Sequence, residues 1–157
     1  MVNMVDYNKV SDIFQYIRNI SIFRRIFKQF VSVDRLIQSS VALVTPSFER
    51  LGVTLSCEQF SDISAYVDEL AIEQVLVNLL KNALDAVSYS SKKIKEVKVF
   101  TSLDSGNNSF SIHIQDSGDG VREEDVDKIF NPFFTTKELG EGTGMGLSLS
   151  SQIVEEH

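Results

Sequence analysis

The stretch from Asp116 to Leu147 constrains the fold of this chain more than any other. It holds six of the eight glycines in two clusters separated by a polar spacer, at Gly118, Gly120, Gly140, Gly142, Gly144 and Gly146. Glycine costs backbone entropy on folding, so a dense run usually indicates positive φ angles or a ligand that lies against bare backbone. We therefore expect a nucleotide-binding loop with a lid between the clusters.

The composition is that of one globular domain. With 157 residues, 43% of them hydrophobic, the chain can bury a single core. Its net charge of −7 gives no electrostatic reason to expect nucleic acid or an anionic membrane as a partner, because both attract positive proteins. A nucleotide would then need local groups and a metal ion.

The sequence predicts a cytoplasmic location. No apolar run approaches the roughly 20 residues of a membrane span, and residues 1–10 lack the basic start and apolar block of a signal peptide. The single cysteine, Cys57, cannot form an internal disulfide, which fits a reducing compartment.

Residues 8–30 have the apolar spacing of a helix. Large apolar side chains recur every three or four positions, at Ile13, Ile17, Ile20, Phe23, Phe27 and Phe30. More apolar residues lie between them than one free amphipathic helix needs. The segment is therefore either a core helix of this domain or the interface of a homodimer formed through residues 8–30.

A second helix is expected from Asp34, a good N-cap, to the stop signal at Gly52, with a kink or break at Pro46. Two short strands should follow, at residues 53–57 and 64–67.

A long helix capped by Asp68 should then run to about Ser90. Strands at 96–102 and 109–116 have the pattern of a hairpin, and a last helix opens at the second glycine cluster. This order predicts an α+β fold: a two-layer α/β sandwich with helices on one face of a mixed, mostly antiparallel sheet.

The long helix carries a narrow polar stripe. Asn78, Asn82 and Asp85 stand at i, i+4 and i+7, so their side chains project from one face, while the rest of the helix is rich in apolar residues. Amide and carboxylate oxygens suit Mg²⁺, which takes its remaining ligands from water and phosphates. The bland alternative is an ordinary polar helix edge.

The first glycine cluster follows a candidate base-binding residue. Asp116 ends an alternating strand, where its carboxylate can accept hydrogen bonds from an exocyclic amine such as that of adenine. Gly118 and Gly120 would let the backbone turn beside that ring, although an ordinary Asp-Gly turn at a strand end explains the same residues.

The second cluster, GEGTGMG, runs directly into helix-forming sequence. Bare backbone amides at a helix N-terminus bind phosphate. The spacing matches neither the GxGxxG of dinucleotide-binding units nor the GxxxxGK[ST] of P-loops.

These elements, in this order, resemble the ATP-binding domain of histidine kinases, in the superfamily that includes gyrase, MutL and the large heat-shock chaperone. EQVLVNLLKNALDA resembles the N box, DSGDG the first glycine box, NPFFTTK the F box and GEGTGMGL the second glycine box. The resemblance covers residues 32–157 and implies the family's Bergerat-type fold with ATP and Mg²⁺ as cofactors.

The resemblance also implies residue roles. Asn82 would bind Mg²⁺ with help from Asn78, Asp116 would receive the adenine amine, and residues 131–141 would form the ATP lid, anchored by Phe133 and Phe134 unless these are plain core residues. The implied catalytic residues are Asn78, Asn82 and Lys137. The implied nucleotide-binding residues are Asn82, Asp85, Ala86, Asp116, Gly118, Gly120, Val121, Ile129, Phe130, Thr135, Thr136, Lys137, Gly140, Gly142, Thr143, Gly144, Met145, Gly146 and Leu147.

Asn78 separates two branches of that superfamily. Relatives that hydrolyse ATP have a glutamate there that activates water, whereas an amide is not a useful base at neutral pH. The resemblance therefore implies phosphoryl transfer to a protein residue, with positioning and Mg²⁺ supplying most of the catalysis.

The acceptor is expected on another segment. Neither His113 nor His157 has the setting of an acceptor histidine, so the implied partners are the phosphoacceptor helical hairpin of the same kinase and a downstream response regulator. Residues 1–31 resemble the end of that hairpin, and the chain ends at His157, where the family continues with further strands. The alternatives are a nucleotide-responsive interaction module without phosphotransfer and an ATPase, which Asn78 disfavours.

Overall fold

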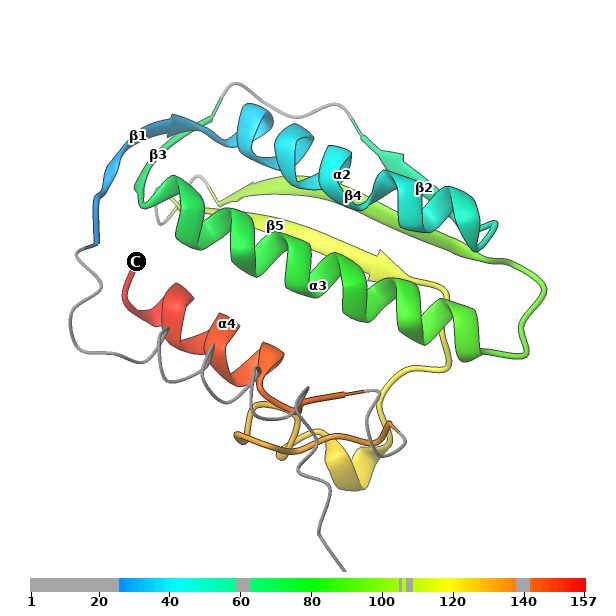
Figure 1. The fold of residues 1–157 in the computed structure, drawn as a ribbon. Helices are drawn as coiled ribbons and strands as arrows, with labels where there is room; N and C mark the ends of the chain where they lie inside the picture. The colour runs from blue at the N-terminus through cyan, green and yellow to red at the C-terminus, as the bar shows by residue number, and fades with distance from the viewer. Residues whose placement is uncertain (1–25, 59–62, 105, 107–108, 138–141) are drawn as a thin grey trace, which may run out of the picture.

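The computed structural model is drawn in Figure 1, and the residues that it describes are 26–58, 63–104, 106, 109–137 and 142–157. The helix predicted over residues 8–30, and with it most of the predicted segment 1–31, falls largely outside these ranges. The helices and strands predicted after residue 31 lie within them.

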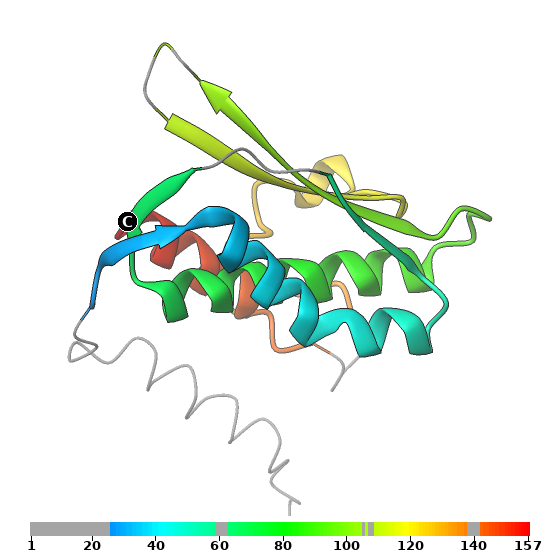
Figure 2. The same ribbon diagram turned by 90° about the horizontal axis from the view of Figure 1, so that it is seen from above.

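Among the described residues, three α-helices cover one side of the strands. α2 (Val33–Arg50) and α3 (Glu69–Tyr89) pack against each other, and α4 (Gly146–Glu155) packs on α3. Figure 2 shows α2 and α3 side by side below the larger sheet. The predicted two-layer α/β sandwich is confirmed.

The described strands form two sheets. β4 (Glu96–Asp104) is the central strand of the larger one, parallel to β2 (Thr54–Cys57) and antiparallel to β5 (Ser109–Asp116). β1 (Gln29–Ser32) and β3 (Ser64–Val67) form a separate antiparallel ribbon. The predicted hairpin is thus present, and the larger sheet has the mixed character expected for it.

The structure corrects the end of the first predicted helix, because the chain is extended at Gln29 and Phe30. Both residues belong to β1, and the Phe30 ring lies 5.2 Å from the ring of Tyr66 in β3. Strand alternation turns Val31 into the core. The partner strand lies much later in the chain, so the local apolar spacing gave no sign of this pairing.

The start of α2 also differs from the prediction. Its N-cap is Ser32, whose Oγ accepts the backbone N–H of Arg35 at 3.4 Å. Asp34 is instead in the first helical turn, where its carboxylate accepts hydrogen bonds from Gln38.

The predicted break at Pro46 is wrong, since α2 runs unbroken through it to Arg50, while the alternative, a kink there, stays a prediction. Proline removes one backbone donor, but Val44 and Phe48 on either side are buried in the core. Tertiary packing therefore keeps this part of the chain helical.

α3 begins and ends close to where the sequence predicts. The Asp68 carboxylate caps it by accepting the N–H of Ala71 at 3.1 Å, and Ser90 is the C-cap. Its apolar side packs between α2 and the inner face of the sheet, where Val97 and Val99 of β4 are fully buried. The central helix is thereby fixed against both layers.

The C-terminal end of α4 packs on the beginning of α3. Ile153 packs against Ala71 and Val75 of α3, and the His157 ring accepts the Asp68 N–H through Nε2 at 3.1 Å. At the other end of α4, Gly146 lies against Asn78, in the middle of α3.

None of the helices in the described ranges combines the length and hydropathy needed to cross a bilayer.

Candidate functional site

The polar stripe of α3 faces the beginning of α4. Asn78, Asn82 and Asp85 are all half-buried. Asn78 Nδ2 donates to Ser150 Oγ at 3.0 Å, and a Cβ at Gly146 would lie 2.3 Å from Asn78 Oδ1. The glycine therefore lets the α4 backbone approach the asparagine amide more closely than any side chain would permit.

The first turn of α4 has no side-chain cap at Met145, whereas Ser32 caps α2 and Asp68 caps α3. The first backbone N–H groups of a helix have no partner within it. In α4 they follow directly after the second glycine cluster and are suited to an anionic group.

Lys137 connects the stretch between the glycine clusters to α3, because its ammonium forms an ion pair with the Asp85 carboxylate. A Cβ at Gly142 would lie 2.7 Å from Thr135 Oγ1 and 3.1 Å from Lys137 Cδ. Glycine at this position thus lets the chain just after the predicted lid pack closely against Thr135 and Lys137.

Gly144 lies against the F-box backbone. Its φ is +66°, and a Cβ there would lie 2.4 Å from the carbonyl carbon of Phe133. Phe133 itself has a φ of +67° and an exposed side chain, while Phe134 is half-buried. The lid-anchoring role predicted for these rings stays a prediction.

Asp116 and Gly118 form a tight turn at the end of β5. The Gly118 N–H donates to Asp116 Oδ1 at 2.8 Å, and a Cβ at Gly118 would lie 2.9 Å from the carbonyl oxygen of Ala86 in α3. Within the described part of the chain, Asp116 Oδ2 has no hydrogen-bond partner. One carboxylate oxygen is therefore fixed by the turn, and the other remains available to a ligand.

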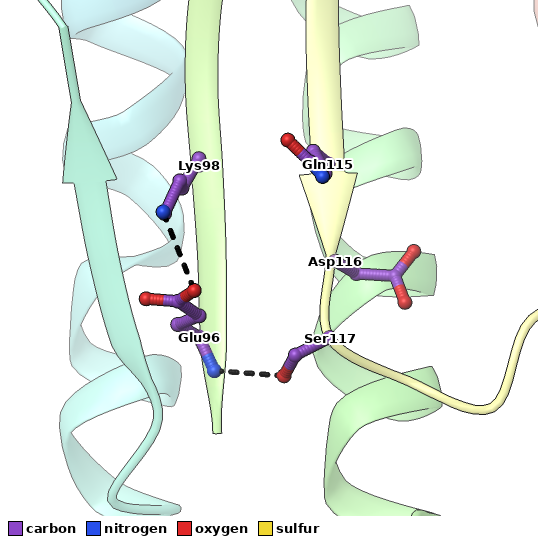
Figure 3. A pocket seen from close by; sticks show the side chains of 5 residues that line it. All are labelled: Glu96, Lys98, Gln115, Asp116 and Ser117. Atoms are coloured by element: carbon purple, nitrogen blue, oxygen red, sulfur yellow. Dashed lines mark hydrogen bonds and ion pairs between the residues drawn. The ribbon is translucent and has the colours of Figure 1, made fainter. Parts of the chain in front are cut away.

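Asp116 points to a different side of the sheet from its neighbours. Figure 3 shows a shallow pocket lined by Glu96, Lys98, Gln115, Asp116 and Ser117, in which the Asp116 carboxylate points away from the other four side chains. Lys98 pairs with Glu96 at 3.4 Å on this outer face. Asp116 therefore lies at the rim of that pocket, and its carboxylate is close to the end of α3, since Asp116 Oδ1 and the Ala86 carbonyl oxygen flank the same side of Gly118.

The remaining predicted residues lie around this centre. Gly120 turns the chain with a φ of +81°, Ile129 is half-buried, and Val121 and Phe130 are exposed. Thr136 and Thr143 are exposed, Leu147 is half-buried, and Gly140 lies outside the described residues. The structure therefore brings the two glycine clusters and the polar stripe together along α3, while Val121 and Phe130 present their side chains to solvent.

The part of the chain that forms this site matches a known protein family. Residues 67–157 match the model described as histidine kinase-, DNA gyrase B-, and HSP90-like ATPase, a range that contains the whole polar stripe and both glycine clusters. The chain belongs to this ATPase family. The recognition made from the four sequence motifs is thereby confirmed.

Individual relatives point to the histidine-kinase branch of the family. The chain is 33% identical over 132 residues to the sensor protein FixL of Bradyrhizobium diazoefficiens, covering 83% of this chain and 25% of FixL. The nucleotide-free catalytic domain of the histidine kinase ThkA superposes with a TM-score of 0.69 at 28% identity, covering 83% of this chain and 81% of that one.

A second ThkA structure, in complex with the response regulator protein TrrA, superposes with a TM-score of 0.73 at 25% identity, covering 96% of this chain and 40% of that one. The chain thus spans a quarter of FixL and matches a catalytic domain along most of that domain's length.

Two features of this ATPase domain were missed from the sequence. Ser90 and Lys92, just beyond α3, hold the first glycine cluster through hydrogen bonds to Asp119 and Gly118. Asp125 in the 3-10 turn η1 (Glu123–Asp125) is buried and ion-paired with Arg122 at 2.6 Å. Lysines and serines after a helix are usually solvated, so only the folded chain reveals these contacts.

The described residues contain no cluster of three or more His, Cys, Asp or Glu side chains able to hold a metal. Cys57 is the last residue of β2, and partial burial raises the pKa of its thiol.

Proposed function

We propose that this chain is the ATP-binding catalytic domain of a sensor histidine kinase, which transfers the γ-phosphate of ATP to a histidine on a separate helical hairpin. The observation that carries the proposal is the convergence of three separate segments on α3: the Asp116 turn, Lys137, and the start of α4 at Gly146. Membership of the ATPase family and the likeness to FixL and ThkA support it.

The base would bind at Asp116, with the exocyclic amine of adenine donating to the carboxylate. Gly118 already holds Oδ1 in place, so Oδ2 is the acceptor left for the ligand. A preorganised acceptor loses little freedom on binding.

Mg²⁺ would be held by Asn82, assisted by Asn78. The donor set fits this ion: Asn78 Nδ2 is engaged by Ser150, which leaves the amide oxygen as the donor, and the scarcity of carboxylates suits a cation that takes other ligands from phosphates. When bound, Mg²⁺ supplies neutralisation of charge on the phosphates.

The phosphates would lie at the start of α4, where the uncapped amides after Gly144 donate to them. Lys137 would then exchange its Asp85 partner for phosphate oxygens. Asn78 offers an amide where hydrolysing relatives have a base, so the chain is expected to leave water unactivated and deliver the phosphoryl group to an acceptor.

The acceptor hairpin and the response regulator are the proposed partners, the second supported by the ThkA complex with TrrA. Both histidines of this chain are already engaged: His113 Nε2 lies 2.7 Å from Ser102 Oγ and the ring stacks on Phe100, and His157 contacts Ile153 and Asp68. A homodimer through residues 8–30 stays a prediction, since residues 1–25 lie outside the described ranges.

Labelled ATP with Mg²⁺ and a purified hairpin that carries an acceptor histidine tests the proposal. We expect acid-labile label on the hairpin, lost by at least about tenfold with Asp116→Asn because the base would lose a charged acceptor. Gln115→Ala is the matched control, since Gln115 adjoins Asp116 but faces the outer pocket.

Two results would contradict the proposal. Nucleotide binding without label on any hairpin would indicate an interaction module, and steady phosphate release by the chain alone would indicate an ATPase.

A further inference from the structure

Lys92 fixes the turn that carries the candidate base acceptor. Its Nζ donates to the Gly118 carbonyl oxygen at 2.6 Å, while the Gly118 N–H donates to Asp116 Oδ1 at 2.8 Å. Both backbone polar groups of one glycine are therefore committed, the carbonyl to the lysine and the amide to the carboxylate.

Ser90 ties the same lysine to the end of α3. Its hydroxyl is buried, donates to Asp119 Oδ1 at 2.7 Å and accepts the Lys92 N–H at 3.1 Å. Two neighbouring residues of the glycine loop, Gly118 and Asp119, are thus anchored to two nearby residues beyond the helix.

The end of α3 that precedes Ser90 and Lys92 is itself held by further hydrogen bonds. Lys95 Nζ donates to the carbonyl oxygens of Val87 and Ser90, which closes the C-terminal end of α3. Gly118 approaches the Ala86 carbonyl so closely that a Cβ would lie 2.9 Å from it. The loop therefore rests on the helix backbone and has little room to shift while Lys92 holds it.

We propose that Lys92 is a positioning residue for base discrimination: by holding the Gly118 carbonyl, it keeps the Gly118 amide on Asp116 and so fixes the direction of the carboxylate. The inference rests on the proposed function. Adenine presents an amine donor to such an acceptor, whereas guanine presents a carbonyl oxygen on the corresponding ring carbon. A fixed carboxylate repels that oxygen, and a carboxylate free to rotate avoids it.

Calorimetric titration of the full 157-residue chain with Mg-ADP and Mg-GDP tests this role without turnover. For Lys92→Met we expect about tenfold weaker ADP binding and a fall of about fivefold in the preference for ADP over GDP, as for loss of a hydrogen bond to a charged group. Lys92→Arg, which keeps a charged donor, should restore both to within about threefold.

Lys93→Met is the matched control. Lys93 adjoins Lys92, is exposed, and has no side-chain partner among the described residues. The Lys93→Met variant loses the same charge from the same segment as Lys92→Met. Its dissociation constants for both nucleotides should therefore stay within about twofold of the wild-type values.

Two results for Lys92→Met would overturn the inference. The first is nucleotide binding equal to that of Lys93→Met. The second is equal weakening of both nucleotides together with a lower melting temperature, which would make the role of Lys92 merely structural. Wild-type protein that binds neither nucleotide would overturn the proposed function together with the inference, whereas wild-type binding with an unchanged Lys92→Met ratio would overturn the inference alone.

Discussion

At the scale of single residues, charge decides what Lys137 does. Its ammonium is neutralised by Asp85, a residue of the same helix face as Asn78 and Asn82. In the proposed function the same ammonium binds phosphate, so Asp85 competes with the ligand for it. The carboxylate also adds negative charge where phosphates would lie.

Asp85→Asn should therefore tighten Mg-ATP binding by about two- to fivefold, the range for an ion pair that solvent still reaches, while Lys137→Met should weaken it. Calorimetry at moderate salt measures both dissociation constants. Lys81→Met, an exposed lysine elsewhere on α3, controls for net charge. Weaker binding by Asp85→Asn would show that the carboxylate supports the ligand and does not compete with it.

Substitution of Gly144 and of Gly120 by alanine distinguishes the cost of backbone strain from the cost of steric overlap. Both have positive φ, but a Cβ at Gly144 would overlap the Phe133 carbonyl, whereas a Cβ at Gly120 meets open space. Gly144→Ala should lower the free energy of unfolding by about 2–4 kcal/mol, and Gly120→Ala by about 1 kcal/mol. Urea unfolding followed by circular dichroism measures both, and equal losses would rule out the overlap.

At the scale of elements, the sequence predicted the helices and strands whose caps, turns and apolar period lie within the element itself. α3 was found from Asp68 to Ser90 because its cap and apolar period lie within the element, and the β4–β5 hairpin was found for the same reason. β1 was missed because its partner strand is distant in sequence. Pro46 stays helical because neighbouring side chains are buried, which no helix propensity records.

In the candidate site too, the features that depend on local sequence were predictable, and the contacts between distant segments were not. The polar stripe follows from helical spacing, and the glycine clusters from composition, so both were predictable. The hold of Lys92 and Ser90 on the glycine loop depends on where two distant segments meet. The pairing of Lys137 with Asp85 has the same origin, since the sequence only suggested a cation near phosphate.

Asp68 offers a test at this scale, because it joins three elements. Oδ1 caps α3 through Ala71, Oδ2 accepts the N–H of Phe27 before β1, and its own N–H binds His157 after α4. Asp68→Ala should lower the free energy of unfolding by about 1–2 kcal/mol.

Asp34→Ala, at the position that the sequence suggested as the cap of α2, should cost less than about 0.5 kcal/mol, since Asp34 lies inside the helix and contacts only Gln38. Thermal and urea unfolding of both variants compare them. A larger loss at Asp34 would mean that the cap of α2 is not Ser32.

At the scale of the whole molecule, α3 is contacted by α2, α4 and two strands of the larger sheet, β4 and β5. The sheet and α2 pack on its apolar side, α4 packs along its length, and the first glycine cluster rests on its C-terminal end. Charges and backbone amides from distant parts of the chain therefore share one rigid support, and the family membership of the chain is reflected in that arrangement.

Because Gly118 lies so close to the Ala86 carbonyl, α3 fixes the distance between the base loop and the metal candidate Asn82. A helix rises about 1.5 Å and turns about 100° per residue, so the four residues from Asn82 to Ala86 separate the metal candidate from the base loop by about 6 Å along the axis. Insertion or deletion of a single residue would rotate one end of the site away from the other by about 100°, so the length of this stretch is as important as its buried residues Ala83 and Leu84.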